Sequence, residues 1–599
     1  MAGIPKARVE TISRHLTGDT TSFLADSRPK FKLEDHPVDA VRSLKGRRNL
    51  NVAVIGAGIS GITAGVLFPA KVPGINLTIF EKNRDVGGTW FENIYPGVRC
   101  DVPANVYQST YSPNTQWTEE FAQGPEIRAY WQNLASKQNV YQYIKFERKV
   151  THAQWDPVEA KWVIRVHDLK SQNTTTEKFD ILITAIGRFN AWKLPEYPGI
   201  DEYQGHLRHS SNWDPNFDAT GKRVAVIGNG ASGIQIVPEL QKVAQHLDHY
   251  ARSRTWIAGS LGGRDRLAEP MRFSQEQQKD FQDPEKYLAY RKALENTYWT
   301  KFAGLLKNSK ESLASREEFR ELMAKRLTEK PELLDAIVPD FSPNCRRLTP
   351  GPGYLEALSK ENVSFIQRKI KRFTKGGIET EDGVHRPVDA VICSTGANVD
   401  YAFPFPVVSG DVDLAEAWKP EGKFGFPYSY LGFATPGFPN LFFIHGPNAA
   451  GHSGTFPHGV ENQVAYLSRL LRKISGQGIK SLVPSKAAAD DFVEYCDAFF
   501  PTTVLTEGCS SWSNGGRPGA RIHGHWPGSA AHLNFIRRSP RWEDFEYEVL
   551  ESNKSGNRFS YWGNGRTAKE SDSGSDLTPY LKTPDQVDLR DWHESWWDL

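Results

Sequence analysis

Residues 51–70 read NVAVIGAGISGITAGVLFPA and carry no charge, and this stretch limits the possible folds more than any other. Its length is close to the roughly 20 residues that cross a bilayer. The glycines argue against a membrane span, because the apolar residues 52–55 precede Gly56, Gly58 and Gly61 in the pattern G-x-G-x-x-G. That order predicts a buried parallel strand, a tight turn and a helix.

Each glycine of such a turn has a physical role when a dinucleotide is bound. The first permits the turn, the second lets the backbone approach a pyrophosphate, and the third lets the helix pack on the strand. The N-terminal amides of the helix then face the anion. A second apolar segment, residues 75–80, ends at Glu81. An acid about 20 residues beyond the turn binds ribose hydroxyls. The first site therefore suits FAD or NAD.

The same pattern recurs in RVAVIGNGASGIQIVPEL, with Gly228, Gly230 and Gly233. The next predicted strand is followed by Arg252 and Ser253, and no carboxylate stands at the ribose position. A guanidinium and a hydroxyl bind a 2′-phosphate, which an acid would repel. We therefore predict NADPH in the second site. The alternative is that Arg252 and Ser253 belong to an ordinary solvated loop.

Two nucleotide sites with different ribose chemistry indicate a two-dinucleotide flavoprotein, in which FAD occupies one domain and NADPH delivers hydride from the other. The predicted fold class is α/β, with two Rossmann-like dinucleotide-binding domains. Apolar segments within residues 179–200 and 388–400 each close on a short Thr/Gly turn and would return the chain to the sheets. Taken alone, either segment is equally explained as a plain buried strand.

Residues 264–340 are rich in Glu, Lys, Gln and Leu and predict a helical insertion in the NADP-binding domain. Ser315 and Glu318 have the spacing of a capping box, so we expect a helix to begin there. Apolar residues follow at helical spacing, and core packing explains them better than a ligand site. They are Phe319, Leu322, Met323 and Leu327.

The predicted domain organisation starts with an N-terminal extension at residues 1–48 and the first part of the FAD-binding domain at 49–213. The NADP-binding domain follows at 214–394, and the second part of the FAD-binding domain at 395–550. Residues 551–599 form a C-terminal tail, whose stretch KESDSGSD is typical of a flexible linker.

Composition argues against several other classes of protein. The formal net charge of the 599-residue chain is +2, so nothing indicates binding to nucleic acid or to a membrane surface. The five cysteines are scattered without a C-x-x-C pair, which argues against a disulfide framework, a zinc site and disulfide-reductase chemistry. The first residues lack the apolar core of a secretory signal, so we expect a reducing, cytoplasmic location. The histidines show no metal-site spacing, and the sequence indicates no oligomeric state.

The segment YQGHLRHSSNWD resembles the fingerprint of type I Baeyer-Villiger monooxygenases, F-x-G-x-x-x-H-x-x-x-W followed by Pro or Asp. Gly205, His209 and Trp213 match this fingerprint, and Tyr203 replaces the phenylalanine. With a G-x-G-x-x-G turn on each side, the chain resembles the class B flavin-dependent monooxygenases over residues 50–547. The segments YPGVRCDVPANVY, CRRLTPGPGYLEAL and HWPGSAAHLNF resemble those of fungal members that act in secondary metabolism.

The resemblance implies roles for individual residues. Those that would contact FAD are Gly56, Gly58, Ser60, Gly61, Glu81, Gly87, Gly88, Thr89, Trp90, Asp101 and Tyr107. Those that would lie near the nicotinamide are Arg99, Cys100, Asp101 and Trp512. Those that would bind the phosphates of NADP are Gly228, Asn229, Gly230, Ala231, Ser232, Gly233, Ile234, Gln235, Arg252 and Ser253. Arg346 and Arg347 match a basic pair at the cofactor site.

The resemblance also implies the activity. With FAD, NADPH and O2, one oxygen atom is inserted next to a ketone carbonyl through a peroxyflavin, which gives an ester or a lactone. We expect a bulky or cyclic natural-product ketone as the substrate. Arg347 would be catalytic, because its permanent charge can stabilise the peroxyanion and the adduct that follows. Asp101 would hold Arg347 in place, and the alternative for this pair is a purely structural ion pair.

Two further alternatives follow from the same segments. A sister flavin monooxygenase would hydroxylate its substrate or oxidise nitrogen or sulfur instead of inserting oxygen beside a ketone. His209 and Trp213 lie between the two domains and would fix how the domains sit and move. The alternative for these two residues is a linker with a purely structural role.

Overall fold

The protein was studied as a computed structural model, which describes residues 33, 35–38, 48–189, 191–258, 271–550, 559–578 and 581–587. The chain divides into two compact units. The smaller unit comprises Met1–Asn49, Arg472–Ser481 and Tyr547–Leu599, and the larger one Leu50–Leu471 and Leu482–Glu546. Most of the predicted N-terminal extension, residues 264–270 of the predicted insertion and parts of the predicted tail lie outside the described residues.

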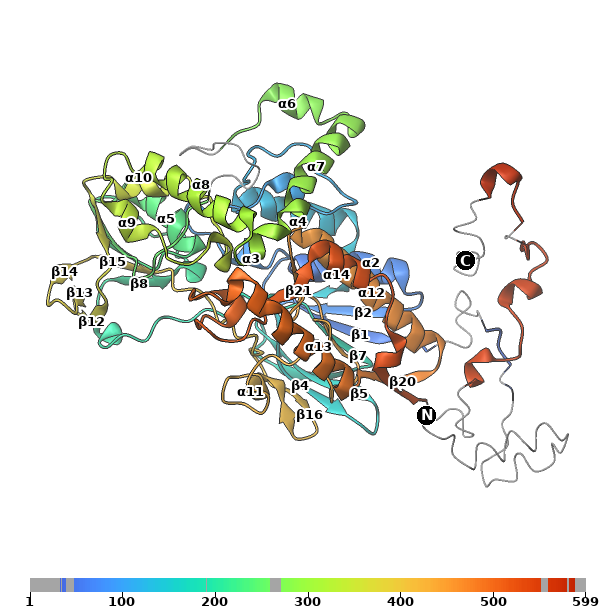
Figure 1. The fold of residues 1–599 in the computed structure, drawn as a ribbon. Helices are drawn as coiled ribbons and strands as arrows, with labels where there is room; N and C mark the ends of the chain where they lie inside the picture. The colour runs from blue at the N-terminus through green and yellow to red at the C-terminus, as the bar shows by residue number, and fades with distance from the viewer. Residues whose placement is uncertain are drawn as a thin grey trace. The chain divides into compact units, whose positions relative to one another are not determined.

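The first sheet of the larger unit has five parallel strands in the order β18-β7-β1-β2-β3 (Figure 1). Its strands are β1 (Asn51–Ile55), β2 (Asn76–Phe80), β3 (Ile144–Lys145), β7 (Ile181–Thr184) and β18 (Leu441–Phe443). Strands β7 and β18 are buried throughout, as their unbroken apolar sequences require. The predicted strand before Gly56 and the one within residues 179–200 are confirmed. Because β18 joins β7 from late in the chain, the first domain contains a second, distant part of the sequence.

The second sheet also has five parallel strands, in the order β11-β10-β9-β15-β8. They are β8 (His206–His209), β9 (Arg223–Ile227), β10 (His246–Tyr250), β11 (Val363–Ile366) and β15 (Ala390–Cys393). Helices α2 (Ile59–Lys71) and α5 (Ala231–Gln241) follow the two glycine turns. The α/β prediction with two Rossmann-like sheets is confirmed. Strand β8 contains His209 of the fingerprint segment, so the chain enters the second sheet before residue 213.

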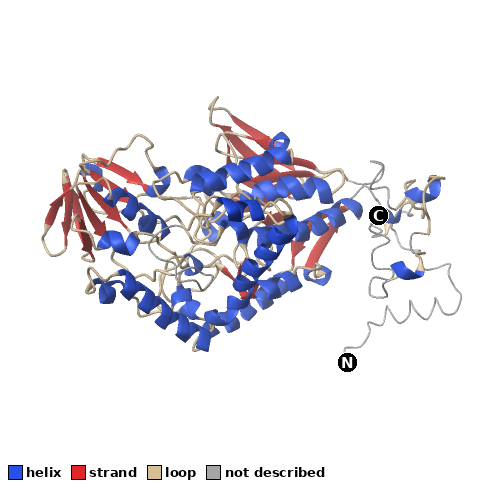
Figure 2. Ribbon diagram, turned by 90° about the horizontal axis from the view of Figure 1, so that it is seen from above, coloured by secondary structure: helices blue, strands red, loops and turns tan. Residues whose placement is uncertain are grey.

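A mixed sheet and an antiparallel sheet accompany the two parallel ones, and neither was predicted from the sequence. One has the order β17-β16-β4-β5-β6. Its strands are β4 (Arg148–Asp156), β5 (Lys161–Asp168), β6 (Thr174–Phe179), β16 (Val407–Ser409) and β17 (Val412–Asp413). Its core contains Trp155, Trp162, Phe403 and Trp418. A smaller sheet consists of β12 (Ile370–Thr374), β13 (Gly377–Thr380) and β14 (His385–Pro387). Figure 2 shows the strands gathered in separate groups with helices around them.

The predicted insertion is helical over its described part, residues 271–340. It contains α6 (Gln275–Asp280), α7 (Pro284–Trp299), α8 (Lys310–Arg326) and α9 (Leu333–Ile337). The predicted helix start at Ser315 is wrong. Helix α8 is capped by Ser309, whose side chain accepts a hydrogen bond from the Ser312 amide, so Ser315 and Glu318 lie within the helix. The apolar stripe is buried, which confirms its prediction as core: Phe319, Leu322, Met323 and Leu327.

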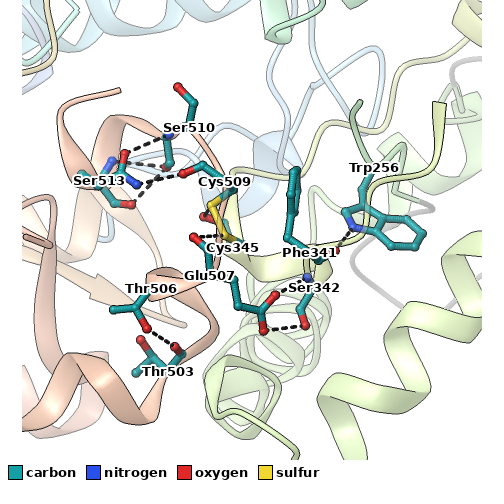
Figure 3. The surroundings of a disulfide bond; sticks show 12 residues. Trp256, Phe341, Ser342, Cys345, Thr503, Thr506, Glu507, Cys509, Ser510 and Ser513 are labelled. Atoms are coloured by element: carbon teal, nitrogen blue, oxygen red, sulfur yellow. Dashed lines mark hydrogen bonds between the residues drawn. A yellow bond between two sulfur atoms is a disulfide. The ribbon is translucent and has the colours of Figure 1, made fainter. Parts of the chain in front are cut away.

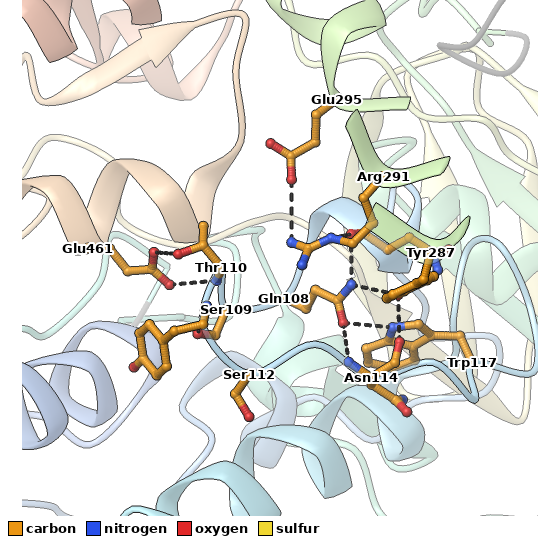
Figure 4. Close-up of polar contacts among 12 residues, drawn as sticks. Gln108, Ser109, Thr110, Ser112, Asn114, Trp117, Tyr287, Arg291, Glu295 and Glu461 are labelled. Atoms are coloured by element: carbon orange, nitrogen blue, oxygen red, sulfur yellow. Dashed lines mark hydrogen bonds and ion pairs between the residues drawn. The ribbon is translucent and has the colours of Figure 1, made fainter. Parts of the chain in front are cut away.

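The insertion is bound to a loop of the first domain (Figure 4). The Tyr287 hydroxyl on α7 donates to the carbonyl of Asn114 at 2.6 Å and accepts from the Gln108 amide at 2.8 Å. The Arg291 Nε donates to the carbonyl of Asn105 at 3.1 Å. These contacts fix two successive turns of α7 to residues 105–114.

The remaining elements come mostly from the C-terminal half of the chain. They are α3 (Thr89–Glu92), α4 (Gly124–Lys137), α10 (Tyr354–Leu358), α11 (Leu414–Ala417), β19 (Ala450–His452), α12 (Phe456–Gly476), β20 (Ile479–Pro484), α13 (Lys486–Phe499), β21 (His525–Ser529), α14 (Ala530–Ile536) and β22 (Phe545–Val549). Short 3-10 helices at Ser560–Trp562, Ala568–Ser571 and Pro584–Gln586 lie in the described part of the tail. None of the described helices is long and apolar enough to cross a membrane.

Candidate active site

The first glycine turn leaves no room for side chains. Gly56 has a φ of +103°, and a Cβ there would lie 2.7 Å from the carbonyl oxygen of Ala185 on the neighbouring strand connection. A Cβ on Gly61 would collide with the Gly56 carbonyl. Gly88 packs against the turn, since a Cβ on it would lie 2.9 Å from the Gly58 Cα. The turn and the GGTW segment thus form a bare backbone cradle, which fits a bound pyrophosphate.

Glu81 lies at the end of β2, beside this cradle. Its carboxylate accepts hydrogen bonds from the amides of Ala57 at 2.7 Å and Asn83 at 2.8 Å, and the side chain is buried. Burial raises the pKa of Glu81 above its ordinary value, although both amide bonds oppose that change. The carboxylate is therefore held in place for the ribose contact predicted from the sequence.

The aromatic residues predicted beside FAD lie together. The Trp90 Nε1 donates to the Tyr107 hydroxyl at 3.4 Å, and their rings meet edge to face with centroids 5.7 Å apart. Tyr107 in turn stacks on Phe456, the first residue of α12.

The second glycine turn repeats the first. Gly228 has a φ of +102°, and a Cβ there would collide with the carbonyl of Ser394. The Arg346 guanidinium lies beside this turn, 3.6 Å from the position of a Cβ on Gly230. Arg252 and Ser253 are exposed just beyond the end of β10. The structure thus brings a cation to the predicted pyrophosphate site and leaves Arg252 accessible to a 2′-phosphate.

Gln235 was predicted to contact NADP, and in the structure it also joins the two domains. Its Oε1 accepts from the Tyr95 hydroxyl at 3.0 Å, and its Nε2 donates to the carbonyl of Arg99 at 3.0 Å. The Arg99 guanidinium pairs with Glu119 at 3.1 Å. Cys100 is buried, and burial raises the pKa of its thiol above the ordinary value. The loop that carries Asp101 is therefore anchored on both sides.

Arg347 and Asp101 form a two-point ion pair. The Arg347 Nε lies 2.6 Å from Asp101 Oδ2, and Nη2 lies 2.7 Å from Oδ1. The charge of Asp101 raises the pKa of Arg347 further above its ordinary value. The side chain of Arg347 remains 48% exposed, so the pair is not sealed in the core. The contact expected between these two residues is therefore present.

The structure contains a disulfide, although the cysteine spacing argued against a disulfide framework. Cys345 and Cys509 form a disulfide, with Cα atoms 6.2 Å apart and a sequence separation of 164 (Figure 3). The Ser342 hydroxyl donates to the Glu507 carboxylate at 2.9 Å and reinforces the same junction. Spacing rules detect local pairs such as C-x-x-C, whereas this pair is created by the tertiary fold. The cysteine pattern therefore no longer supports a reducing compartment, and a cytoplasmic location stays a prediction.

Trp512 lies three residues beyond this disulfide, and it packs on a basic side chain that the sequence analysis missed. The Arg188 guanidinium carbon lies 4.2 Å from the centroid of the Trp512 ring. On the same ring packs His525, with centroids 4.5 Å apart. Arg188 follows β7 closely, and ligands of open α/β sheets bind beyond the carboxyl ends of the strands. The position of Arg188 just after a predicted parallel strand was therefore the feature of the sequence that could have indicated it.

The fingerprint residues lie where the two sheets are connected. The Ser211 amide donates to His209 Nδ1 at 3.1 Å, so the opposite nitrogen, Nε2, carries the proton and donates to the carbonyl of Gly396 at 3.0 Å. Burial lowers the pKa of His209, which favours this neutral form. The His209 ring stacks on Trp192, and Trp192 forms a short antiparallel bridge with Ala397. His209 thus contacts both connections between the sheets.

Tyr203 replaces the phenylalanine of the fingerprint, and its additional hydroxyl has a specific hydrogen-bond partner. Its hydroxyl donates to the carbonyl of Val388 at 2.9 Å. The ring lies so close to Gly205 that a Cβ there would collide with it. Trp213 meets Phe217 edge to face, with ring centroids 5.9 Å apart. The extra hydroxyl is accommodated by a backbone carbonyl that the phenylalanine of the fingerprint would leave without this bond.

No group of three or more His, Cys, Asp or Glu side chains within the described residues is arranged to hold a metal ion.

Comparison with known proteins decides the class. A family model described as flavin-binding monooxygenase-like matches residues 49–267. The FAD-binding monooxygenase tazF of Aspergillus terreus is 33% identical over 543 residues, which cover 89% of this chain and 95% of that protein. The chain belongs to the flavin-binding monooxygenase family.

Other relatives agree. This flavin-binding monooxygenase is 32% identical to a Baeyer-Villiger monooxygenase of Pseudomonas aeruginosa over 471 residues, which cover 78% of this chain and 85% of that protein. Cyclohexanone monooxygenase from Rhodococcus sp. Phi1, solved with NADP+ bound, has the same fold with a TM-score of 0.71 and 22% identity. That match covers 84% of this chain and 99% of the solved one. The predicted family, the enzyme class and the use of FAD and NADPH are confirmed at the level of the family.

Proposed function

We propose that this flavin-binding monooxygenase is a Baeyer-Villiger monooxygenase, which inserts one oxygen atom from O2 next to a ketone carbonyl to give an ester or a lactone. The two-point contact between Arg347 and Asp101 carries the proposal. It supplies a permanently charged, partly exposed guanidinium in the region where both dinucleotide domains meet. A bulky or cyclic natural-product ketone is the proposed substrate, supported by the resemblance to fungal members.

The two glycine turns and their neighbours would hold the cofactors. The bare cradle at Gly56 and Gly88 fits the pyrophosphate of FAD, and Glu81 fits its ribose. The turn at Gly228 with Arg346 fits the pyrophosphate of NADPH, and Arg252 fits its 2′-phosphate. When bound, FAD supplies the oxygen-activating chemistry and NADPH supplies the reducing hydride.

Arg347 would stabilise the negative charge that develops on the carbonyl oxygen of the ketone. A guanidinium suits this role because it keeps its proton and can donate two parallel hydrogen bonds. Asp101 orients it through Nε and Nη2. Both N–H groups of Nη1 and the second N–H of Nη2 stay available for the substrate oxygen. The side chain is 48% exposed, which lets the substrate approach these donors.

Trp512 and Cys100 would complete the site around the nicotinamide. Trp512 is partly exposed and lies three residues after Cys509, whose disulfide partner Cys345 precedes the basic pair. One covalent bond therefore keeps Trp512 and Arg347 in the same neighbourhood. Exclusion of water from that neighbourhood supports oxygen transfer, since solvent competes with the ketone for activated oxygen.

The test is a product assay with labelled oxygen. Purified protein with FAD and NADPH would be given 4-phenylcyclohexanone under 18O2, and mass spectrometry would locate the label. We expect a lactone that carries one 18O atom in its ring. The matching thioether, thioanisole, is the control substrate. Sulfoxide formation without any lactone would contradict the proposal and favour the sister class that oxidises heteroatoms.

A further inference from the structure

Arg188 lies at the centre of a set of side chains from three distant parts of the chain. Its guanidinium carbon lies 4.2 Å from the Trp512 ring centroid and 5.2 Å from that of Tyr401. Its Nη2 donates to Nε2 of His445 at 2.9 Å, because a guanidinium can only donate. Arg188, Tyr401, His445 and Trp512 are all partly exposed, so a ligand can reach this set from outside.

The charge of Arg188 has no carboxylate partner among the described residues. Its Nε is buried and has no hydrogen-bond partner there, and its Nη1 makes a long contact of 3.4 Å with the carbonyl of Gly524. Arg326, which is also withdrawn from solvent, shows the usual arrangement, because it pairs with Glu356 at 2.8 Å. A buried charge without a partner is costly. The structure therefore keeps a cation here at the expense of stability.

A second arginine adds to the local positive charge. Arg537, just after α14, is 3% exposed, and its Nε and Nη2 lack partners among the described residues. Burial, followed by the charges of Arg188 and Arg537, holds the pKa of His445 well below its ordinary value. Arg347 is close enough to Arg188 for the two charges to repel each other. Asp101 balances Arg347, whereas the other two arginines are left in excess.

The backbone around Arg188 is strained. Tyr401 has a φ of +63° and His445 a φ of +61°, a region that bulky residues rarely occupy. Such conformations persist where the surrounding structure enforces them, and they cluster at functional sites. Both strained residues contact Arg188. The strain therefore points to a positioning requirement on this guanidinium.

The phosphates of the two cofactors already have their own partners. Under the proposed function, the pyrophosphate of FAD lies at the Gly56 turn, that of NADPH lies beside Arg346, and the 2′-phosphate lies at Arg252. None of these phosphates is therefore the counterion of Arg188. Under the proposed function, the contact of Arg188 with Trp512 puts the guanidinium beside the nicotinamide. The only other molecule expected there is the substrate.

We propose that Arg188 binds an anionic oxygen of the substrate, so that the ketone carries a carboxylate or an ionised phenol or enol. This inference rests on the proposed function, because it uses the assignment of the cofactor phosphates. The Arg188 guanidinium, which has no carboxylate partner among the described residues, is the donor for that oxygen, and such charge-assisted bonds are about twice as strong as neutral ones. Trp512 and Tyr401 would hold the guanidinium plane between their rings.

Equilibrium binding tests this inference without turnover. The protein loaded with FAD and NADP+ would be titrated in a calorimeter with 4-(4-oxocyclohexyl)benzoate and with its uncharged methyl ester. We expect the acid to bind about tenfold or more tightly than the ester. The variant Arg188→Gln should remove this preference, and Arg165→Gln, which removes an exposed charge on β5, should keep it. Equal affinity of the wild-type protein for acid and ester would overturn the inference.

Further measurements separate the possible failures. If Arg188→Gln weakens NADP+ as much as it weakens the acid, then Arg188 is a cofactor ligand and the inference fails. If the acid preference is present but no ketone is oxygenated, then the inference stands and the proposed oxygen insertion fails. 4-(4-Hydroxyphenyl)cyclohexanone distinguishes a phenolate from a carboxylate site, because a phenol bound as its anion shows a red-shifted absorbance. Tight binding of the benzoate without such a shift would assign the site to carboxylates.

Discussion

Asp101 and Arg347, which are 246 residues apart in sequence, meet through two parallel hydrogen bonds of 2.6 and 2.7 Å. Asp101 belongs to the loop that follows the first dinucleotide turn, and Arg347 follows the helical insertion of the second domain. The pair therefore links the domains of the two parallel sheets, which are the cofactor domains of the proposed function. It also leaves the Arg347 side chain 48% exposed.

Arg347→Ala should abolish oxygen insertion while it leaves reduction of the flavin by NADPH largely intact. Loss of a donor to a developing oxyanion typically slows a reaction by about 10²–10³-fold. Stopped-flow absorbance would follow flavin reduction and reoxidation separately, and a product assay would follow the lactone. Arg347→Lys is the matched variant, because it keeps the charge but loses the two-point geometry. An unchanged product yield in Arg347→Ala would remove Arg347 from the reaction.

Arg252→Ala should raise the KM for NADPH by about 10–100-fold, since it removes a charged contact to the 2′-phosphate. The KM for NADH, which lacks that phosphate, should change little. Arg254→Ala is the matched control, because Arg254 is an exposed neighbour that pairs with Asp340 at 3.5 Å. Steady-state kinetics would measure the KM for NADPH and the KM for NADH of the wild-type protein and of both variants. Equal increases for NADPH and NADH would refute the assignment.

Replacing Cys345 and Cys509 together with serine should lower the free energy of unfolding by about 2–4 kcal/mol, as is typical when a disulfide is removed. Denaturant unfolding, with and without dithiothreitol, would measure this change. Dithiothreitol should destabilise the wild-type protein and have no effect on the double variant. Cys393→Ala, at a free buried cysteine, should leave the response to dithiothreitol intact. A wild-type protein that is insensitive to complete reduction would contradict the role given to this bond.

Stability should fall as the pH is lowered below about 6.5. Burial lowers the pKa of His249 to about 4, so the unfolded chain binds a proton there that the folded chain does not. Between the two pKa values the free energy of unfolding should decrease by about 1.4 kcal/mol for each pH unit from this group. His249→Gln, whose side-chain oxygen can accept from the Tyr354 hydroxyl as Nε2 of the neutral ring does, should flatten that part of the profile. An unchanged slope in chemical unfolding across this window would show that His249 does not cause it.

The local parts of the fold were predictable from sequence, and the parts created by distant contacts were not. The strands and turns at Gly56 and Gly228 could be predicted because the G-x-G-x-x-G pattern and the apolar run before it are made of residues that are neighbours in sequence. The antiparallel strands β4, β5 and β6 pair through tertiary contacts, and in β5 the buried Trp162 and Ile164 alternate with more exposed residues over a short stretch only. The disulfide depends on a separation of 164 residues and has no local pattern.

The same distinction applies to the candidate site. Asp101 and Arg347 were found through a family resemblance, which carries information about tertiary contacts indirectly. Arg188 belongs to no motif, and only its contacts with Trp512 and His445 make it conspicuous. The start of helix α8 shows the same limit. Ser309 and Ser315 are both acceptable N-cap residues by sequence, and only the structure identifies Ser309 as the cap.

The contacts of His209 and Trp192 also determine how the two sheets can move. The chain leaves the first sheet after β7 and returns from β15, and the two crossings are joined by the Trp192–Ala397 bridge, by the Asn398 amide to the Ala191 carbonyl at 2.7 Å and by His209 to Gly396. Two segments of the chain that are hydrogen-bonded side by side resist a change in length more strongly than they resist twisting. Relative motion of the cofactor domains should therefore be a rotation about this ribbon, with little change in their separation.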